Sequence, residues 1–124
     1  MDEQRKFARL DTTLPVTYRT LPASEPQHSS TKNISGGGIC VFVEESLAPK
    51  TLVEVEITLP DRQRPIVFTG EVVWCEQFQV VGKQARSIQA GVRFVSISPD
   101  DQQAILQHVI LNFQPRPPAS PPHP

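Results

Sequence analysis

Alternation of apolar and polar side chains is the feature of this sequence that most limits how the chain can fold. Between residues 53 and 59 apolar residues at the odd positions alternate with Glu54, Glu56 and Thr58. A period of two residues is that of a β-strand with one buried and one exposed face. Weaker alternation places further strands in four other segments, at residues 14–18, 39–43, 67–74 and 88–94. The sequence therefore predicts an all-β domain of five or six strands.

Short connections rich in turn-forming residues separate these strands. They lie at residues 22–30, 47–50, 60–65 and 79–84. Connections of this length join antiparallel neighbours. An antiparallel meander of this size tends to close into a barrel, because closure removes the exposed strand edges. With 124 residues the chain has room for one such domain, which we expect to span residues 1–113.

A single helix is expected after the last strand. Ser98 suits the N-cap, Pro99 suits the first helical position, and Asp100 and Asp101 add acidic side chains to the first turn. Apolar residues recur behind them at three- and four-residue spacing and would cover an open end of the barrel. These residues are Ile105, Leu106, Val109, Ile110 and Phe113. The next segment, residues 114–124, contains six prolines and predicts a disordered tail.

Charge and the residues that could carry chemistry argue against several function classes. The net charge of -1 provides no overall field to attract nucleic acid or an anionic membrane. No catalytic or metal-binding pattern is formed by the three scattered histidines and the two separate cysteines. Of the histidines, His108 is expected at the boundary of the helix face. No signal peptide or apolar run of the ~20 residues that span a bilayer occurs. We expect a cytoplasmic protein without membrane insertion, and no enzyme, cofactor or metal site.

Two short motifs remain whose side chains suit a nucleotide. Arg5 and Arg9 lie four residues apart before the first strand, and guanidinium groups bind phosphates and stack on rings. Asn33 and Ser35 face one side of a strand and can read the edge of a base. Three glycines at 36–38 follow, where a flat ligand can lie against bare backbone. Each motif alone is also typical of a solvated terminus or a simple turn.

Together the two motifs resemble those of the PilZ domain family, in which RxxxR on an N-terminal segment precedes (D/N)xSxxG. The matching residues are Arg5, Arg9, Asn33, Ser35 and Gly38. The strand sequences at residues 14–16, 70–74 and 91–94 are also similar to those of the family, so the resemblance covers residues 5–113.

The resemblance implies an antiparallel β-barrel of six or seven strands, capped by a C-terminal helix, that binds cyclic di-GMP on its outer surface and catalyses nothing. By this analogy Arg5 and Arg9 hold phosphates and stack on guanine, while Asn33 and Ser35 bind a guanine edge. Gly38 would keep the strand surface clear for the ligand. Many members carry Asp at the position of Asn33, and a neutral amide that offers one acceptor oxygen implies a lower affinity.

Four further residues are candidates for the same site. Gly36 and Gly37 belong to the glycine run. Trp74 is either a platform on which a base stacks or, as is commoner for a lone strand Trp, a core residue. Arg93 falls between two inward-facing residues and so points outward, where a basic residue assists the ligand in some family members.

The position of the arginines suggests how such a receptor signals. Residues 1–12 contain few apolar side chains, so we expect them to be mobile without ligand and to order over it. A downstream protein, which the sequence does not identify, would recognise the surface so formed. The main alternative is an adaptor of the same family that contacts proteins without a ligand. A nucleic-acid-binding barrel is a weaker one, since the chain has one Trp and one Tyr to stack on bases.

Overall fold

The computed structural model describes residues 8–22, 24–79, 82 and 86–112. Arg5 and the proline-rich tail therefore lie outside the described residues. The described part forms seven strands followed by one helix. They are β1 (Arg9–Asp11), β2 (Pro15–Thr20), β3 (Gln27–Ser35), β4 (Gly38–Val43), β5 (Leu52–Ile57), β6 (Ile66–Gln79), β7 (Arg86–Ser96) and α1 (Pro99–Asn112).

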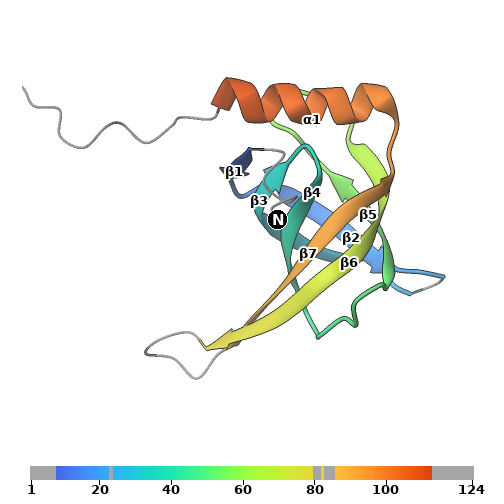
Figure 1. Ribbon diagram of the computed structural model, residues 1–124, viewed down its shortest axis with the longest axis vertical. Helices are drawn as coiled ribbons and strands as arrows, with labels where there is room; N and C mark the ends of the chain where they lie inside the picture. The colour runs from blue at the N-terminus through green and yellow to red at the C-terminus, as the bar shows by residue number, and fades with distance from the viewer. Residues whose placement is uncertain (1–7, 23, 80–81, 83–85, 113–124) are drawn as a thin grey trace, which may run out of the picture.

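The strands form one antiparallel sheet that closes on itself. Its order is β1-β3-β2-β5-β6-β7-β4, and a further pairing of β3 with β4 closes a barrel of six strands. The seventh strand, β1, pairs with the end of β3 on the same edge that β2 occupies further along. Helix α1 lies across one open end of the barrel, and β6 and β7 extend as a ribbon at the other end (Figure 1). The expected barrel of six or seven strands with a C-terminal helix is confirmed.

The alternation in the sequence translates directly into the inside and the outside of this barrel. In β5, Val53, Val55 and Ile57 are at most 1% exposed and belong to the core. Full burial of a side chain of this size contributes ~1.5–3 kcal/mol. Between them Glu54 faces outward and accepts a hydrogen bond of 2.9 Å from Nε of Arg19 on β2.

Strand β3 corrects one expectation from the sequence. Turn-forming residues predict a connection over residues 22–30, but β3 begins at Gln27. Its fully buried side chains, Thr31 and Ile34, are three positions apart because the pairing with β4 shifts register between Thr31 and Asn33. Such a bulge inserts one residue and interrupts the two-residue period by which a strand is read from sequence.

Thr31 joins β1 to the barrel. Its hydroxyl accepts a hydrogen bond of 2.9 Å from the N–H of Leu14 and donates one of 2.6 Å to the carbonyl of Thr12. The backbones add Thr31 N–H to Leu14 O at 3.0 Å and Thr12 N–H to Lys32 O at 3.2 Å. These bonds attach the connection between β1 and β2 to β3. Thr31 is fully buried, so its hydroxyl is shielded from water.

Helix α1 begins where its sequence predicts, since the hydroxyl of Ser98 accepts a 3.1 Å hydrogen bond from the N–H of Asp101. Its buried face agrees with the expected one at Ile105 and Val109 but differs at two other positions. Ile105, His108 and Val109 are buried, whereas Ile110 is 69% exposed. The buried face of the helix thus includes His108, expected at the boundary, and leaves out Ile110. Within the described ranges no helix has the length and apolar character to cross a membrane.

Candidate ligand-binding site

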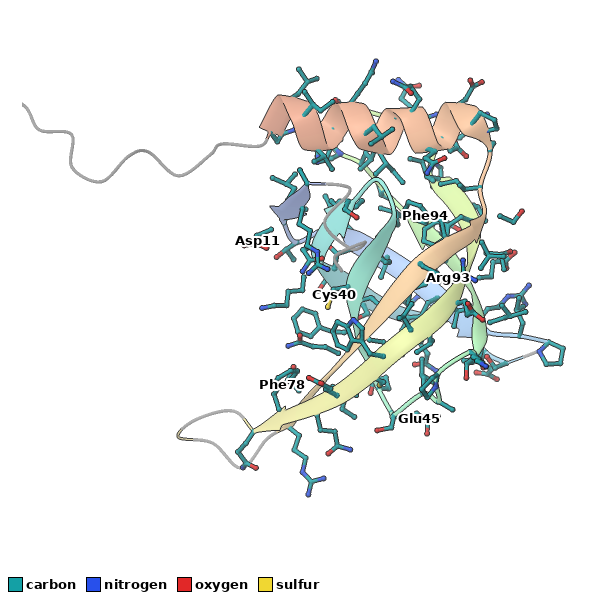
Figure 2. All side chains as sticks on the ribbon, in the orientation of Figure 1. Asp11, Cys40, Glu45, Phe78, Arg93 and Phe94 are labelled. Carbon is teal, nitrogen blue, oxygen red and sulfur yellow. The ribbon has the colours of Figure 1, made fainter. Side chains whose placement is uncertain are left out.

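The strand registers place the residues of the two motifs in adjacent rows on the outside of the barrel. Cross-strand partners share a face of the sheet, so each row is a continuous strip of neighbouring side chains. The first row runs through Arg9, Ser35, the β3–β4 turn, Gly38, Arg93 and Glu71. The second runs through Asp11, Asn33, Cys40, Gly91 and Trp74. In Figure 2, Asp11, Cys40 and Arg93 mark the strands β1, β4 and β7 of this face.

A groove with a volume of about 530 Å³ lies over these two rows. This volume falls within the range of ~300–1,000 Å³ that is usual for small-molecule sites. The groove is lined by Arg9, Asn33, Ser35, Gly37, Gly38, Ile39, Cys40, Val73, Trp74, Gly91, Val92 and Arg93. The structure thus brings together seven of the candidates from the sequence. Gly36 is buried and does not line the groove, and Arg5 lies outside the described residues.

Ser35 shapes the turn between β3 and β4. Its hydroxyl accepts a hydrogen bond of 3.1 Å from the N–H of Gly37 and donates one of 3.3 Å to the carbonyl of Gly38. From outside the turn, the side-chain amide of Gln102 on α1 donates to the carbonyl of Gly36 at 2.9 Å. Both the turn itself and the capping helix therefore fix the backbone at this end of the groove.

Gly38 allows β4 to approach β7 closely. A Cβ on Gly38 would overlap the carbonyl oxygen of Val92 and lie 3.0 Å from Cα of Arg93. These atoms are backbone and cannot rotate away. The lack of a side chain at Gly38 is therefore required by barrel closure, independently of any need to keep the surface clear for a ligand.

Trp74 lies on the outer surface, so its interpretation as a core residue is wrong. Val72 pairs with Val92 and Trp74 pairs with Gly91, which leaves Val73 as an extra residue in β6. This bulge directs two consecutive side chains outward, and Val73 is 52% and Trp74 36% exposed. Both line the groove, and the sequence indicates only Trp74.

Two arginines, Arg9 and Arg93, bring positive charge to the groove. Arg93 faces outward as expected and donates from Nε and Nη2 to one oxygen of Glu71, at 2.7 and 2.6 Å. Two of its five N–H donors are thereby used, and the guanidinium is held in a fixed orientation. Burial raises the pKa of the Cys40 thiol, while the positive charges of Lys32 and Arg9 act to lower it. In the described part of the chain no group of three His, Cys, Asp or Glu residues could hold a metal ion.

The sequence does not indicate the floor of the groove. Cys40 and Gly91, the small residues between Asn33 and Trp74, come from two strands that are far apart in the chain. In the sequence Gly91 stands out only as part of a strand signature. Its place beneath Trp74 depends on the bulge at Val73, which carries no signal in the sequence.

Comparison with known proteins agrees with this fold. The family model of the PilZ domain matches residues 3–111. No curated protein matches the sequence. Among solved structures, Bacillus subtilis MotI/DgrA, titled an inhibitor of motility, is similar with 25% identity and a TM-score of 0.72, over 89% of this chain and 51% of that one.

Two structures with c-di-GMP are also similar in fold. The PilZ domain of YcgR from Escherichia coli with c-di-GMP has 14% identity and a TM-score of 0.70, over 88% of this chain and 91% of that one. The K. pneumonia MrkH–c-di-GMP complex has 18% identity and a TM-score of 0.71, over 90% and 53%. The chain thus spans about half the length of MotI/DgrA and of MrkH. From the match of its sequence over residues 3–111, together with its barrel and helix, this chain belongs to the PilZ domain family.

Proposed function

We propose that this chain is a receptor for cyclic di-GMP that acts through protein contacts and catalyses no reaction. The observation that carries the proposal is the strand register, which aligns Arg9 with Ser35 and Gly38 with Arg93 around one groove. Membership of the PilZ family and the two similar folds solved with c-di-GMP support the same ligand. The free thiols of Cys40 and Cys75 suit a reducing cytoplasm, where we propose that the protein acts.

Each part of a cyclic dinucleotide has a counterpart in the groove. Arg9, with Arg5 from the preceding segment, binds the phosphates and stacks on a guanine, since a guanidinium can do both. Asn33 and Ser35 bind a guanine edge, while Gly37 and Gly38 leave the backbone accessible to the ligand.

The opposite wall would take the other half of the ligand. Trp74 offers an aromatic face for a base, and Arg93 keeps three N–H donors for an anionic or carbonyl group while Glu71 holds it. From β1 to β7 the groove crosses three strand spacings, on the order of 14 Å, which accommodates a ligand with two bases and two phosphates.

Signalling follows from the segment that carries the arginines. Because the strand that carries Arg9 is paired with β3, we propose that the order gained on binding is that of the residues before it, including Arg5. The phosphates give Arg5 a partner, and fixing this segment costs entropy that lowers the net affinity. The ligand, the ordered segment and the barrel face then form the surface that a downstream protein recognises.

Calorimetric titration with cyclic di-GMP, cyclic di-AMP, GMP and GTP tests the ligand. We expect selective binding of cyclic di-GMP. Losing a hydrogen bond to a charged group costs roughly 1.5–3 kcal/mol, so Arg5→Ala and Arg9→Ala should each weaken binding about ten- to a hundredfold. Arg19→Ala is the matched control, because Arg19 forms a surface ion pair with Glu54 and does not line the groove.

Three results would contradict the proposal. The absence of heat with cyclic di-GMP would favour an adaptor that needs no ligand, and equal affinity for cyclic di-AMP would remove Asn33 and Ser35 as readers of guanine. Amide exchange tests the ordering step separately: if residues 3–8 have the same protection with and without cyclic di-GMP, the N-terminal segment is not the switch.

A further inference from the structure

The indole of Trp74 rests directly on the backbone of Gly91. A Cβ on Gly91 would overlap Nε1 of Trp74 and would lie 2.5 Å from Cε2 and 2.9 Å from Cδ1. Real Cβ atoms do not approach other atoms this closely, so the indole occupies the space that any other residue's side chain would need. In a regular sheet the cross-strand partner of a Trp fills this space with its own Cβ.

Two features of β6 and β7 are needed together for this arrangement. The bulge at Val73 turns Trp74 to the outer face and pairs it with Gly91. Gly91 then provides a bare Cα on which the ring can lie. With the bulge but a larger residue at position 91, the side chain of that residue would hold the indole away from the sheet. With Gly91 but no bulge, no side chain would cover the bare backbone of Gly91.

The indole also forms one side of the groove. The second row continues from Trp74 through Gly91 and Cys40 to Asn33, and the two middle residues have small side chains or none. A flat ring that lies on this floor meets the amide of Asn33 at one end and the indole at the other. Lifting the indole away from β7 would change the place of the stacking surface relative to Asn33.

We propose that Gly91 is a positioning residue for the ligand site, because its bare backbone seats the Trp74 indole where a purine base stacks on it. This inference rests on the proposed binding of cyclic di-GMP. Gly91 itself offers no polar side chain to the ligand, so its effect on affinity is exerted through Trp74.

Trp fluorescence of the protein without ligand tests whether the Trp74 indole rests on Gly91. Trp74 is the only Trp of the chain, so its emission and its quenching by acrylamide report the indole alone. We expect Gly91→Ala to shift the emission to longer wavelength and to increase quenching, because the added Cβ displaces the indole toward solvent. Val95→Ala is the matched control on β7, since Val95 is exposed and does not line the groove.

Titration with cyclic di-GMP tests whether the position of the indole affects affinity. Base stacking on an aromatic side chain contributes ~1–3 kcal/mol, so Trp74→Ala should weaken cyclic di-GMP binding on the order of tenfold. We expect Gly91→Ala to give a similar loss and the double variant Gly91→Ala/Trp74→Ala to bind no more weakly than Trp74→Ala. Removing the indole also makes room for the Cβ. In urea unfolding, the substitution Gly91→Ala should therefore cost less stability in the Trp74→Ala background than in the wild type.

The outcomes separate this inference from the proposed function. If Gly91→Ala alters the emission but binds cyclic di-GMP as tightly as wild type, the seat has no role in binding and the inference fails. Unchanged emission, or equal destabilisation with and without Trp74, would show that the indole does not rest on Gly91. If the wild-type protein binds no cyclic di-GMP, the proposed function fails, and the fluorescence and unfolding measurements still decide whether Gly91 seats Trp74.

Discussion

Replacing Thr31 by Val tests how the strand that carries Arg9 is attached to the barrel. Val has nearly the shape of Thr but has no hydroxyl, so the change removes the bonds to Leu14 N–H and Thr12 O and leaves the surrounding packing in place. A buried donor or acceptor left without a partner costs ~1–3 kcal/mol. We therefore expect the free energy of unfolding to fall by about 2 kcal/mol, which moves the urea midpoint by about 1 M for a typical slope.

Two measurements distinguish this local attachment from general damage to the core. Amide exchange should accelerate at Leu14 and in β1, and the affinity for cyclic di-GMP should fall because Arg9 is less firmly placed. Thr31→Ser is the control, since it retains the hydroxyl and loses one methyl group. Its exchange at Leu14 should stay slow. Unchanged protection of Leu14 and β1 in Thr31→Val would refute the role assigned to Thr31.

Two other perturbations follow from the geometry. Gly38→Ala should lower the free energy of unfolding by about 3 kcal/mol, because the new Cβ would meet the immobile backbone of Val92 and separate β4 from β7; an unchanged urea midpoint would contradict this close approach. Burial raises the pKa of Tyr18, the single tyrosine, above 10.0, with the hydrogen bond from the Glu44 N–H acting to lower it and the charges of Glu44 and Glu45 raising it further. The folded state thus keeps a proton that the unfolded state loses, so the contribution of Tyr18 to stability is complete below pH 10 and is lost as the pH rises through the folded pKa. Absorbance titration of tyrosinate in the folded protein measures this directly, and a midpoint at or below 10.0 would be the opposite result.

The parts of the fold that can be predicted from the sequence are those fixed by local rules. Val53 and Val55 alternate with glutamates because each position of a regular strand faces either core or solvent, and Ser98 caps α1 through a bond within one turn. The β-bulges, which interrupt the two-residue period of a strand, cannot be predicted from local rules. The bulges between Thr31 and Asn33 and at Val73 depend on which strand pairs alongside, so the local pattern of β6 favours a core position for Trp74. The polar residues at the start of β3 favour a turn, although they pair with β2.

Some residues of the candidate site can also be recognised from the sequence, whereas others are brought to it only by strand pairing. Arg9 belongs to one of the two sequence motifs and Asn33 and Ser35 to the other, and the β1–β3 pairing brings the three residues together on one face. Cys40 becomes a neighbour of Asn33 through the β3–β4 pairing, and Gly91 joins them only when β4 pairs with β7. The buried face of α1, which includes His108 and leaves out Ile110, is likewise decided by the shape of the barrel end that it covers.

The hydrogen bond from Gln102 to the carbonyl of Gly36 joins the last element of the fold, α1, to the β3–β4 turn, next to the residue that pairs with the first element. This turn is bounded by Ser35, whose cross-strand partner is Arg9 on β1, and it is held from the other side by α1. A tag, a fused domain or a further natural segment at either end therefore joins the protein through an element that is attached to this turn. A domain added at the N-terminus would transmit force through β1, and one added at the C-terminus would transmit force through α1. Both would therefore strain the same six-residue stretch from Asn33 to Gly38.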